Sequence, residues 1–365
     1  MKRAVRDRLL IWLVLAVFAG QRLVAQEASS GLDLRATLSG RVAAATELTQ
    51  PPRSGSAGTA GFRSVFYPTW KMSEHWTVTG AMQVASRPYF LEDYSTKGYG
   101  VKGDLLQASL NYSRISDKGS ILMRAGEMPT AFGSFPLRYD DAENPLIDLP
   151  IEYGYYTAPV SDLGLAGVQL DVARGKWDAR AQFTNSSPAN PRSLFARDQY
   201  GNWTGGAGYT IRQGFRVGAS AYRGPYLDRK SPYFFPGETN PGSLPAHALG
   251  VDVGWAHGHW NLLGEVQKFV MPYTVIPTFR EQAGYAEAKR VLSPRWYLAA
   301  RAGYSAANAT GKAQNFETTA GFRPDRFQII KLGYEFEHYS TGSYRTENAV
   351  AVQIVTTFHR SVARN

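Results

Sequence analysis

The chain contains no cysteine among its 365 residues. An exported protein of this composition gains nothing from disulfide bonds and has to be held together by backbone pairing and side-chain packing. After residue 25, no apolar run reaches the ~20 residues that a helix needs to cross a bilayer. Glycine and aromatic residues are abundant instead. The chain is therefore either a soluble β protein or a protein that crosses a membrane as strands.

The first 25 residues have the composition of a secretory signal peptide. Basic residues precede an apolar run at 9–19, and Ala25 is a suitable small residue for cleavage. Removal of this segment takes away five basic residues and one acidic residue, so the formal net charge falls from +10 to +6. Much of the positive charge thus belongs to targeting, and a nucleic-acid partner is not expected.

Strict alternation of apolar and polar residues marks much of the remaining chain. In the stretch 75–87, Trp76, Val78 and Met82 take even positions, whereas Thr77 and Gln83 take odd ones. A period of two predicts strands with one apolar face. The same period recurs in DLRATLSGR, WDARAQFT, FRVGASAY, WNLLGEVQ, WYLAARAGY, FETTAGF and NAVAVQIVTTF.

Short and long links between these stretches follow one another in turn. Membrane barrels have short periplasmic turns and longer external loops, and this alternation distinguishes them from soluble sandwiches. We therefore predict an all-β fold, a transmembrane antiparallel up-and-down β-barrel of about 16 strands, with 14 or 18 as alternatives because the register of 278–292 is ambiguous. The expected parts are a short segment at 26–32, the barrel at 33–358, a long third external loop at 129–162 and a tail at 359–365.

Aromatic residues bracket the short links. Tryptophan and tyrosine favour the boundary between membrane and water because their rings are apolar and their tips polar. We expect a periplasmic girdle of Trp70, Trp76, Trp177, Trp255, Trp260, Trp296 and Phe327.

Charged residues fall on the face opposite the apolar one. A charge facing lipid at the midplane costs about 2–4 kcal/mol, so these residues are expected to line the lumen. A dry core could not hold so many charges without close pairing, whereas a water-filled channel leaves them solvated. The predicted basic residues of the pore wall are Arg35, Arg41, Arg87, Arg124, Arg180, Arg216 and Arg301.

The segment GEMPTAFGSF at 126–135 opens the long third loop. Its spacing of proline, phenylalanine and glycine resembles that of bacterial outer-membrane porins, in which the third loop folds into the barrel, and a similar turn occurs in phosphate-selective porins. The resemblance implies a water-filled channel in the cell outer membrane for passive diffusion of small hydrophilic solutes or ions. It also implies a homotrimer. NAVAVQIVTTF is similar to the C-terminal strand that the outer-membrane assembly machinery recognises, although in most of that family the aromatic residue ends the chain.

The third loop is rich in acidic residues. An acidic loop facing the basic wall would set a transverse field at the narrowest point of the channel. The alternative is a solvated external loop, or one that binds divalent cations at the surface. The candidate constriction residues are Arg138, Asp140, Asp141, Glu143, Asp148 and Glu152.

Other functions remain as alternatives. A channel selective for phosphate-like anions would suit the wall arginines, and one for oligosaccharides could use Tyr67 and Tyr297 as stacking steps. A barrel hydrolase or a secreted carbohydrate-binding β protein is less well supported. Catalysis is not expected because most histidines fall at short turns, and the sequence has no zinc, phosphate-loop or dinucleotide motif that would call for a metal or cofactor.

Overall fold

The computed structural model describes residues 31–46, 56–90, 100–153, 165–185, 201–225, 244–274, 276–308, 311–340 and 346–363. The expected signal peptide at 1–25 lies outside them. None of the helices in the described part of the chain is both long enough and apolar enough to cross a membrane.

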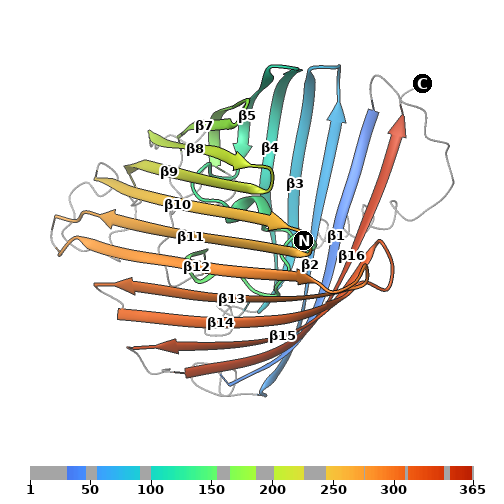
Figure 1. The fold of residues 1–365 in the computed structure, drawn as a ribbon, viewed down its shortest axis with the longest axis vertical. Helices are drawn as coiled ribbons and strands as arrows, with labels where there is room; N and C mark the ends of the chain where they lie inside the picture. The colour runs from blue at the N-terminus through green and yellow to red at the C-terminus, as the bar shows by residue number, and fades with distance from the viewer. Residues whose placement is uncertain are drawn as a thin grey trace, which may run out of the picture.

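Sixteen antiparallel strands form a closed barrel (Figure 1). Each strand pairs with its neighbours in the sequence, and β16 closes the sheet by pairing with β1. The predicted fold class and strand number are confirmed. The strands are β1 (Gly31–Ala45), β2 (Gly58–Lys71), β3 (Trp76–Arg87), β4 (Gly100–Ser116), β5 (Gly119–Met128), β6 (Leu165–Arg174), β7 (Trp177–Thr184), β8 (Asn202–Arg212), β9 (Phe215–Pro225), β10 (Pro245–His257), β11 (Trp260–Met271), β12 (Phe279–Val291), β13 (Trp296–Ala307), β14 (Gly311–Phe322), β15 (Gln328–Tyr339) and β16 (Thr346–Ala363).

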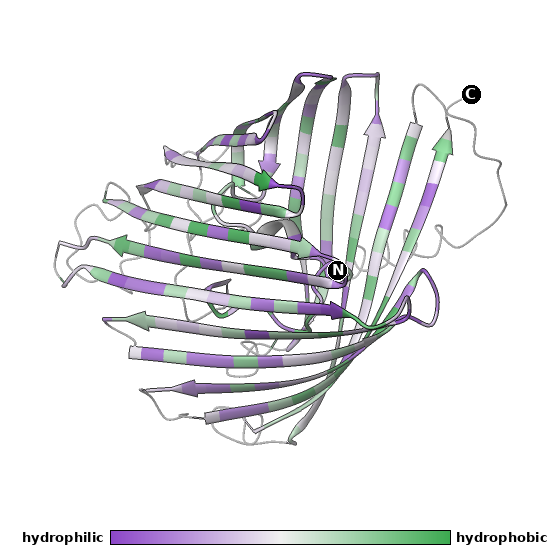
Figure 2. Ribbon diagram, in the orientation of Figure 1, coloured by the Kyte–Doolittle hydropathy of each residue, from purple (hydrophilic) through white to green (hydrophobic). Residues whose placement is uncertain are grey.

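Hydrophilic and hydrophobic residues alternate along the strands (Figure 2), and the burial of alternate residues separates a mostly polar inner face from an apolar outer face. In β1, the inward-facing residues Thr37, Ser39 and Arg41 are buried, whereas the outward-facing Val42 is 62% exposed. The same contrast recurs around the barrel, where Leu249, Val251 and other large apolar residues are exposed. Exposure of so many large apolar side chains is unfavourable in water and favourable in lipid.

The two ends of the chain pair over a greater length than the sequence predicts. β16 continues to Ala363, which lies opposite Gly31, and His359 lies opposite Arg35. The predicted tail at 359–365 and the predicted segment at 26–32 are therefore too long, and the barrel runs from Gly31 to Ala363. The backbone groups of the first residues of β1 need partners in an apolar environment, and the end of β16 supplies them. Phe358 consequently lies within the strand.

The predicted girdle residues lie at the short-turn end of the barrel. Trp70, Trp76 and Trp177 are all exposed. Several rings pack against an aromatic neighbour on the adjacent strand, as Trp177 does with Tyr209 at 4.7 Å between ring centres, and Trp296 with Phe322 at 4.6 Å. The tight turns use glycine where the backbone has positive φ, as at Gly175 (61°) in the two-residue link between β6 and β7.

The connection from β5 to β6 differs from the tight turns. Its described part, 129–153, contains two short 3₁₀ helices, η3 (Phe135–Arg138) and η4 (Ile151–Tyr153). Most of its side chains are buried although it belongs to no strand. This segment, called the third loop below, positions the candidate site.

Candidate channel and its third loop

The third loop lies inside the barrel, where its apolar side chains cover parts of the inner wall. Phe132 packs with Phe269 and Met271, and Leu146 packs with Tyr297 and Val355. Ile147 contacts a group of inward-facing alanines on β1 and β16, namely Ala43, Ala45, Ala349 and Ala351. Because most of the inner face is polar, these clusters of apolar residues mark where the loop rests.

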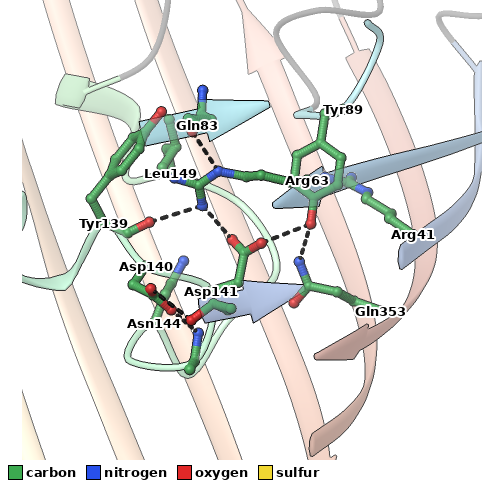
Figure 3. A network of polar contacts seen from close by, with 12 residues as sticks. Arg41, Arg63, Gln83, Tyr89, Tyr139, Asp140, Asp141, Asn144, Leu149 and Gln353 are labelled. Carbon is green, nitrogen blue, oxygen red and sulfur yellow. Dashed lines mark hydrogen bonds and ion pairs between the residues drawn. The ribbon is translucent and has the colours of Figure 1, made fainter. Parts of the chain in front are cut away.

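Arg63 on β2 makes a buried polar contact with the loop (Figure 3). Its Nη1 donates hydrogen bonds to the Asp141 carboxylate at 2.8 Å and to the Tyr139 carbonyl at 3.0 Å, while its Nε donates to Gln83 at 2.7 Å. The Tyr89 hydroxyl donates to the other Asp141 oxygen at 2.8 Å. Burial by itself would raise the pKa of Asp141, but the positive charges of Arg63 and Lys331 lower that pKa below its usual value.

Two further arginines of β1 contact loop carboxylates. Arg41 pairs with Asp148 at 2.8 Å, and both side chains are buried. Arg35 lies 3.6 Å from Asp140. Thr37 donates a hydrogen bond to Asp140 at 2.9 Å, and the Tyr67 hydroxyl donates to the same carboxylate oxygen.

Backbone groups of the loop are bonded by charged side chains of β13–β15. The Lys331 ammonium donates to the carbonyls of Asp141, Asn144 and Leu146 at 2.7–3.0 Å. Arg301 donates to the Asp148 carbonyl and to Glu317, both at 2.6 Å. Glu317 in turn accepts the backbone N–H groups of Ile147 and Asp148 at 2.7 and 3.0 Å. These bonds satisfy loop backbone groups that would otherwise be buried without partners.

The two ends of the described loop meet at β11 and β12. Glu265 accepts hydrogen bonds from the Ser134 hydroxyl at 2.6 Å and from the Tyr153 hydroxyl at 2.8 Å. Arg138 pairs with Glu287 at 2.7 Å. Close to this group, Glu152 is fully buried, and no other residue that the structure describes donates a hydrogen bond to its carboxyl oxygens. Burial, and then the negative charge of Glu265, raise the pKa of Glu152 well above its usual value.

These contacts divide the lumen into two parts. Between the loop and the wall formed by β11–β16, β1 and β2, the space is filled, because Lys331, Arg301 and Glu317 are at most 1% exposed. From β5 to β10 the inner wall keeps accessible charges. The side chains of Arg124 and Asp171 are 25% and 28% exposed, and those of Arg216 and Asp178 are 32% and 41% exposed. Water can reach the side chains of this second part.

The charges of the accessible wall alternate in sign, and all of them except the buried Asp252 are only partly covered. Arg124 lies 3.6 Å from Asp171. Arg216 lies between Asp178 at 2.6 Å and Asp252 at 2.7 Å. Arg180 lies between these two groups and donates a hydrogen bond to the Gly133 carbonyl at 3.3 Å. This set, Arg124, Asp171, Arg180, Asp178, Arg216 and Asp252, is called the paired belt below.

The structure places the predicted basic residues in two groups. Arg35, Arg41 and Arg301 contact the third loop, and Arg124, Arg180 and Arg216 belong to the paired belt, from which Arg180 also reaches the loop. Arg87 belongs to neither group and is exposed at the end of β3.

The predicted loop residues do not form an acidic face across the channel. Asp140, Asp141, Asp148 and Glu152 are buried, and the three aspartates pair with wall arginines. Of the acidic residues predicted there, Glu143 alone is exposed. Most of the negative charge expected to face the channel is therefore neutralised, because the loop carboxylates pair with the wall arginines across from which they were expected to lie. The expected transverse field is correspondingly weaker.

Two wall residues that bind the loop, Arg63 and Glu287, were missed in the sequence. Arg63 lies in a strand whose two faces both look mixed, with Ser64 on one and Val65 on the other. Glu287 lies in the stretch of ambiguous register. The inward alanines of β1 and β16 were an available signal, since apolar residues on a lumen face indicate that something covers them.

The two tyrosines considered as sugar-stacking steps are engaged by the loop. Tyr297 is buried and donates a hydrogen bond to the Pro145 carbonyl at 3.0 Å. Tyr67 is bonded to Asp140 and lies beneath the Arg35 guanidinium, whose carbon is 4.7 Å from the ring centre. Neither ring forms a free stacking surface along the accessible wall.

Solved structures share this architecture. OmpF of Salmonella typhi, in a complex with daunomycin, has a TM-score of 0.62 at 13% identity over 92% of this chain and 100% of its own. The anion-selective porin of Comamonas acidovorans has a TM-score of 0.60 at 11% identity, over 90% of this chain and 100% of its own. The trimer form of OmpT, an outer membrane protein of Vibrio cholerae, has a TM-score of 0.59 at 12% identity, over 90% and 100%.

No protein-family model matches the chain, and no curated protein matches its sequence. The likeness is therefore one of fold. A closed sixteen-strand barrel with an apolar outer surface is an architecture of the bacterial outer membrane, and we assign the chain to that membrane, as its sequence predicts. The predicted resemblance is confirmed at the level of architecture: the chain has the fold of the outer-membrane porins.

Proposed function

We propose that the protein is a porin-like channel for passive diffusion of small hydrophilic solutes or ions, and that it does not act as an enzyme. One observation carries the proposal. The third loop is fixed mainly against β11–β15, β1 and β2, and its first residues also contact β7, β9 and β10. The wall from β5 to β10 nevertheless keeps accessible charged side chains. A barrel of sixteen strands is wide enough to hold water beside such a loop.

The paired belt supports a channel that discriminates only weakly between cations and anions. Its three arginines and three aspartates balance in formal charge, and Arg216 is shared between two carboxylates. A channel selective for anions would be better served by arginines without acidic neighbours. We therefore favour general diffusion over anion or oligosaccharide selectivity.

The partners proposed for the chain are outer-membrane lipid, the outer-membrane assembly machinery and two further copies of itself. The trimer form of the similar Vibrio protein supports the homotrimer. The long β16, which closes the barrel against β1, is the segment that we propose the assembly machinery engages. Migration of unheated and heated protein on a gel tests both the closed barrel and the oligomer.

Planar-bilayer recording tests the proposed function. Folded protein, identified by its slower or faster migration before heating, is expected to insert and give discrete conductance steps. The heated sample from the same preparation is expected to give none. Folded protein that inserts without conducting would contradict the channel, and protein that stays soluble without detergent would favour a secreted β protein.

A further inference from the structure

The lipid-facing surface of β11–β16 contains a groove of about 640 Å³. Its floor consists of small residues, Ala288, Ala300, Thr318 and Ala320. These face outward, since they alternate with inward-facing residues such as Arg301 and Glu317, which are buried against the third loop. Leu298 and Leu332, which are about half exposed, border the floor. The groove is thus an apolar depression in a surface that faces lipid chains.

One end of the groove carries a positive charge. Arg290 and Trp260 both line it, and they lie directly opposite each other on β12 and β11. The Arg290 guanidinium carbon lies 5.2 Å from the centre of the Trp260 ring. Arg290 is exposed and makes no ion pair with any residue that the structure describes. It lies one residue before the end of β12, at the short-turn end of the barrel.

This height suits a lipid phosphate. An arginine on the lipid face costs about 2–4 kcal/mol at the midplane but only about 0–1 kcal/mol near the interface, where it can reach the headgroups. Tryptophan is favoured at the same level. An arginine there offers a planar set of donors that matches phosphate oxygens. The groove therefore offers an apolar surface for a hydrocarbon chain and, at the level of the lipid headgroups, a positive charge.

We propose that this groove binds one phospholipid of the periplasmic leaflet, with an acyl chain along Ala300 and Ala320 and its phosphate on Arg290. The proposal rests on the barrel lying in the outer membrane with its short turns in the periplasm. It does not depend on the channel conducting solutes.

Arg174 provides a matched control. It is an exposed arginine at the end of β6, outward by its alternation with Asp171, and it lies opposite Trp177 just as Arg290 lies opposite Trp260. It is not part of the groove lining. If any arginine at the short-turn end attracted headgroups, Arg174 and Arg290 would contribute equally to lipid binding. A specific site in the groove depends on Arg290 and not on Arg174.

Native mass spectrometry of detergent-purified protein titrated with palmitoyl-oleoyl phosphatidylglycerol tests the proposal. The wild type and Arg174→Gln are expected to retain one lipid, whereas Arg290→Gln, and Ala300→Phe with its filled groove, are expected to bind at least about tenfold more weakly. The matched diacylglycerol, which has no phosphate, is expected to be lost. Heat-modifiable migration confirms that each variant is folded, and Arg290→Gln alone suffices if Ala300→Phe does not fold.

Equal retention by wild type and Arg290→Gln would overturn the site, and equal loss in Arg174→Gln would show unspecific rim binding instead. Bilayer recording of the same samples separates this proposal from the proposed function. Retention of phosphatidylglycerol by a protein that does not conduct would contradict the channel and leave the lipid site standing.

Discussion

Arg63 of β2 and Asp141 of the third loop are joined by a 2.8 Å hydrogen-bonded ion pair in which both side chains are almost completely buried. The pair connects residues 78 positions apart in the chain. Gln83 and the Tyr139 carbonyl accept further hydrogen bonds from the same guanidinium, which fixes its orientation. Fixing the loop at this point leaves the opposite wall accessible.

Removal of Arg63 should destabilise the barrel and free the loop. Arg63→Leu leaves Asp141 buried without its main partner, a loss that typically costs about 3–5 kcal/mol. Urea unfolding in micelles followed by tryptophan fluorescence measures the change. The double variant Arg63→Leu/Asp141→Leu should recover a large part of the loss, because no unpaired charge remains. A single variant as stable as the wild type would show that the pair does not hold the loop.

Glu152 should make the stability depend on pH in the direction opposite to Asp141. Its pKa is raised in the folded protein, so its contribution is fully present below the usual glutamate pKa and is lost as pH rises towards the folded value. Glu152→Gln should therefore match the wild type near pH ~4 and be more stable near pH ~8. Unfolding curves at the two pH values provide the test.

Glu143→Gln serves as the control for Glu152→Gln, because Glu143 belongs to the same loop and is exposed. It should change little at either pH. If the difference in unfolding free energy between the wild type and Glu152→Gln is the same at both pH values, Glu152 is not held in its protonated form.

Arg216 should set the charge balance of the paired belt. Arg216→Gln leaves Asp178 and Asp252 without their shared cation, so the wall becomes more negative. The permeability ratio of cations to anions, taken from the reversal potential in a salt gradient, should rise by about twofold or more. Asp178→Asn should shift it the other way. Unchanged reversal potentials in both variants would place the solute path elsewhere.

The barrel could be predicted from the sequence because its signals are local. Alternation such as that from Trp76 to Val84 gives each strand its two faces, and tight turns such as that at Gly175 mark where one strand ends and the next begins. The end of β16 was missed because the polar residues after Phe358 look like a tail. Pairing with Gly31 and its neighbours is a long-range property that a local pattern does not contain.

The arrangement of the loop could be predicted only in part. Its position and its acidic residues follow from sequence, but which way Asp141 or Asp148 points depends on wall residues far away in the chain. Arg63 was missed as one of these wall residues because its strand has no clear apolar face, so its inward direction could not be predicted. The alanines at 43, 45, 349 and 351 do carry a local signal of contact, since a lumen face in water would favour polar side chains there.

Cysteine accessibility during bilayer recording tests most directly where the channel runs. The chain has no cysteine, so a thiol reagent reports only an introduced one. Asp171→Cys places a thiol on the accessible wall, and Thr319→Cys places one on β14 behind the loop, where Thr319 is 3% exposed. An anionic methanethiosulfonate reagent should reduce the conductance of Asp171→Cys in steps and leave Thr319→Cys and the wild type unchanged. Reaction at Thr319→Cys without reaction at Asp171→Cys would contradict the proposed path along β5–β10.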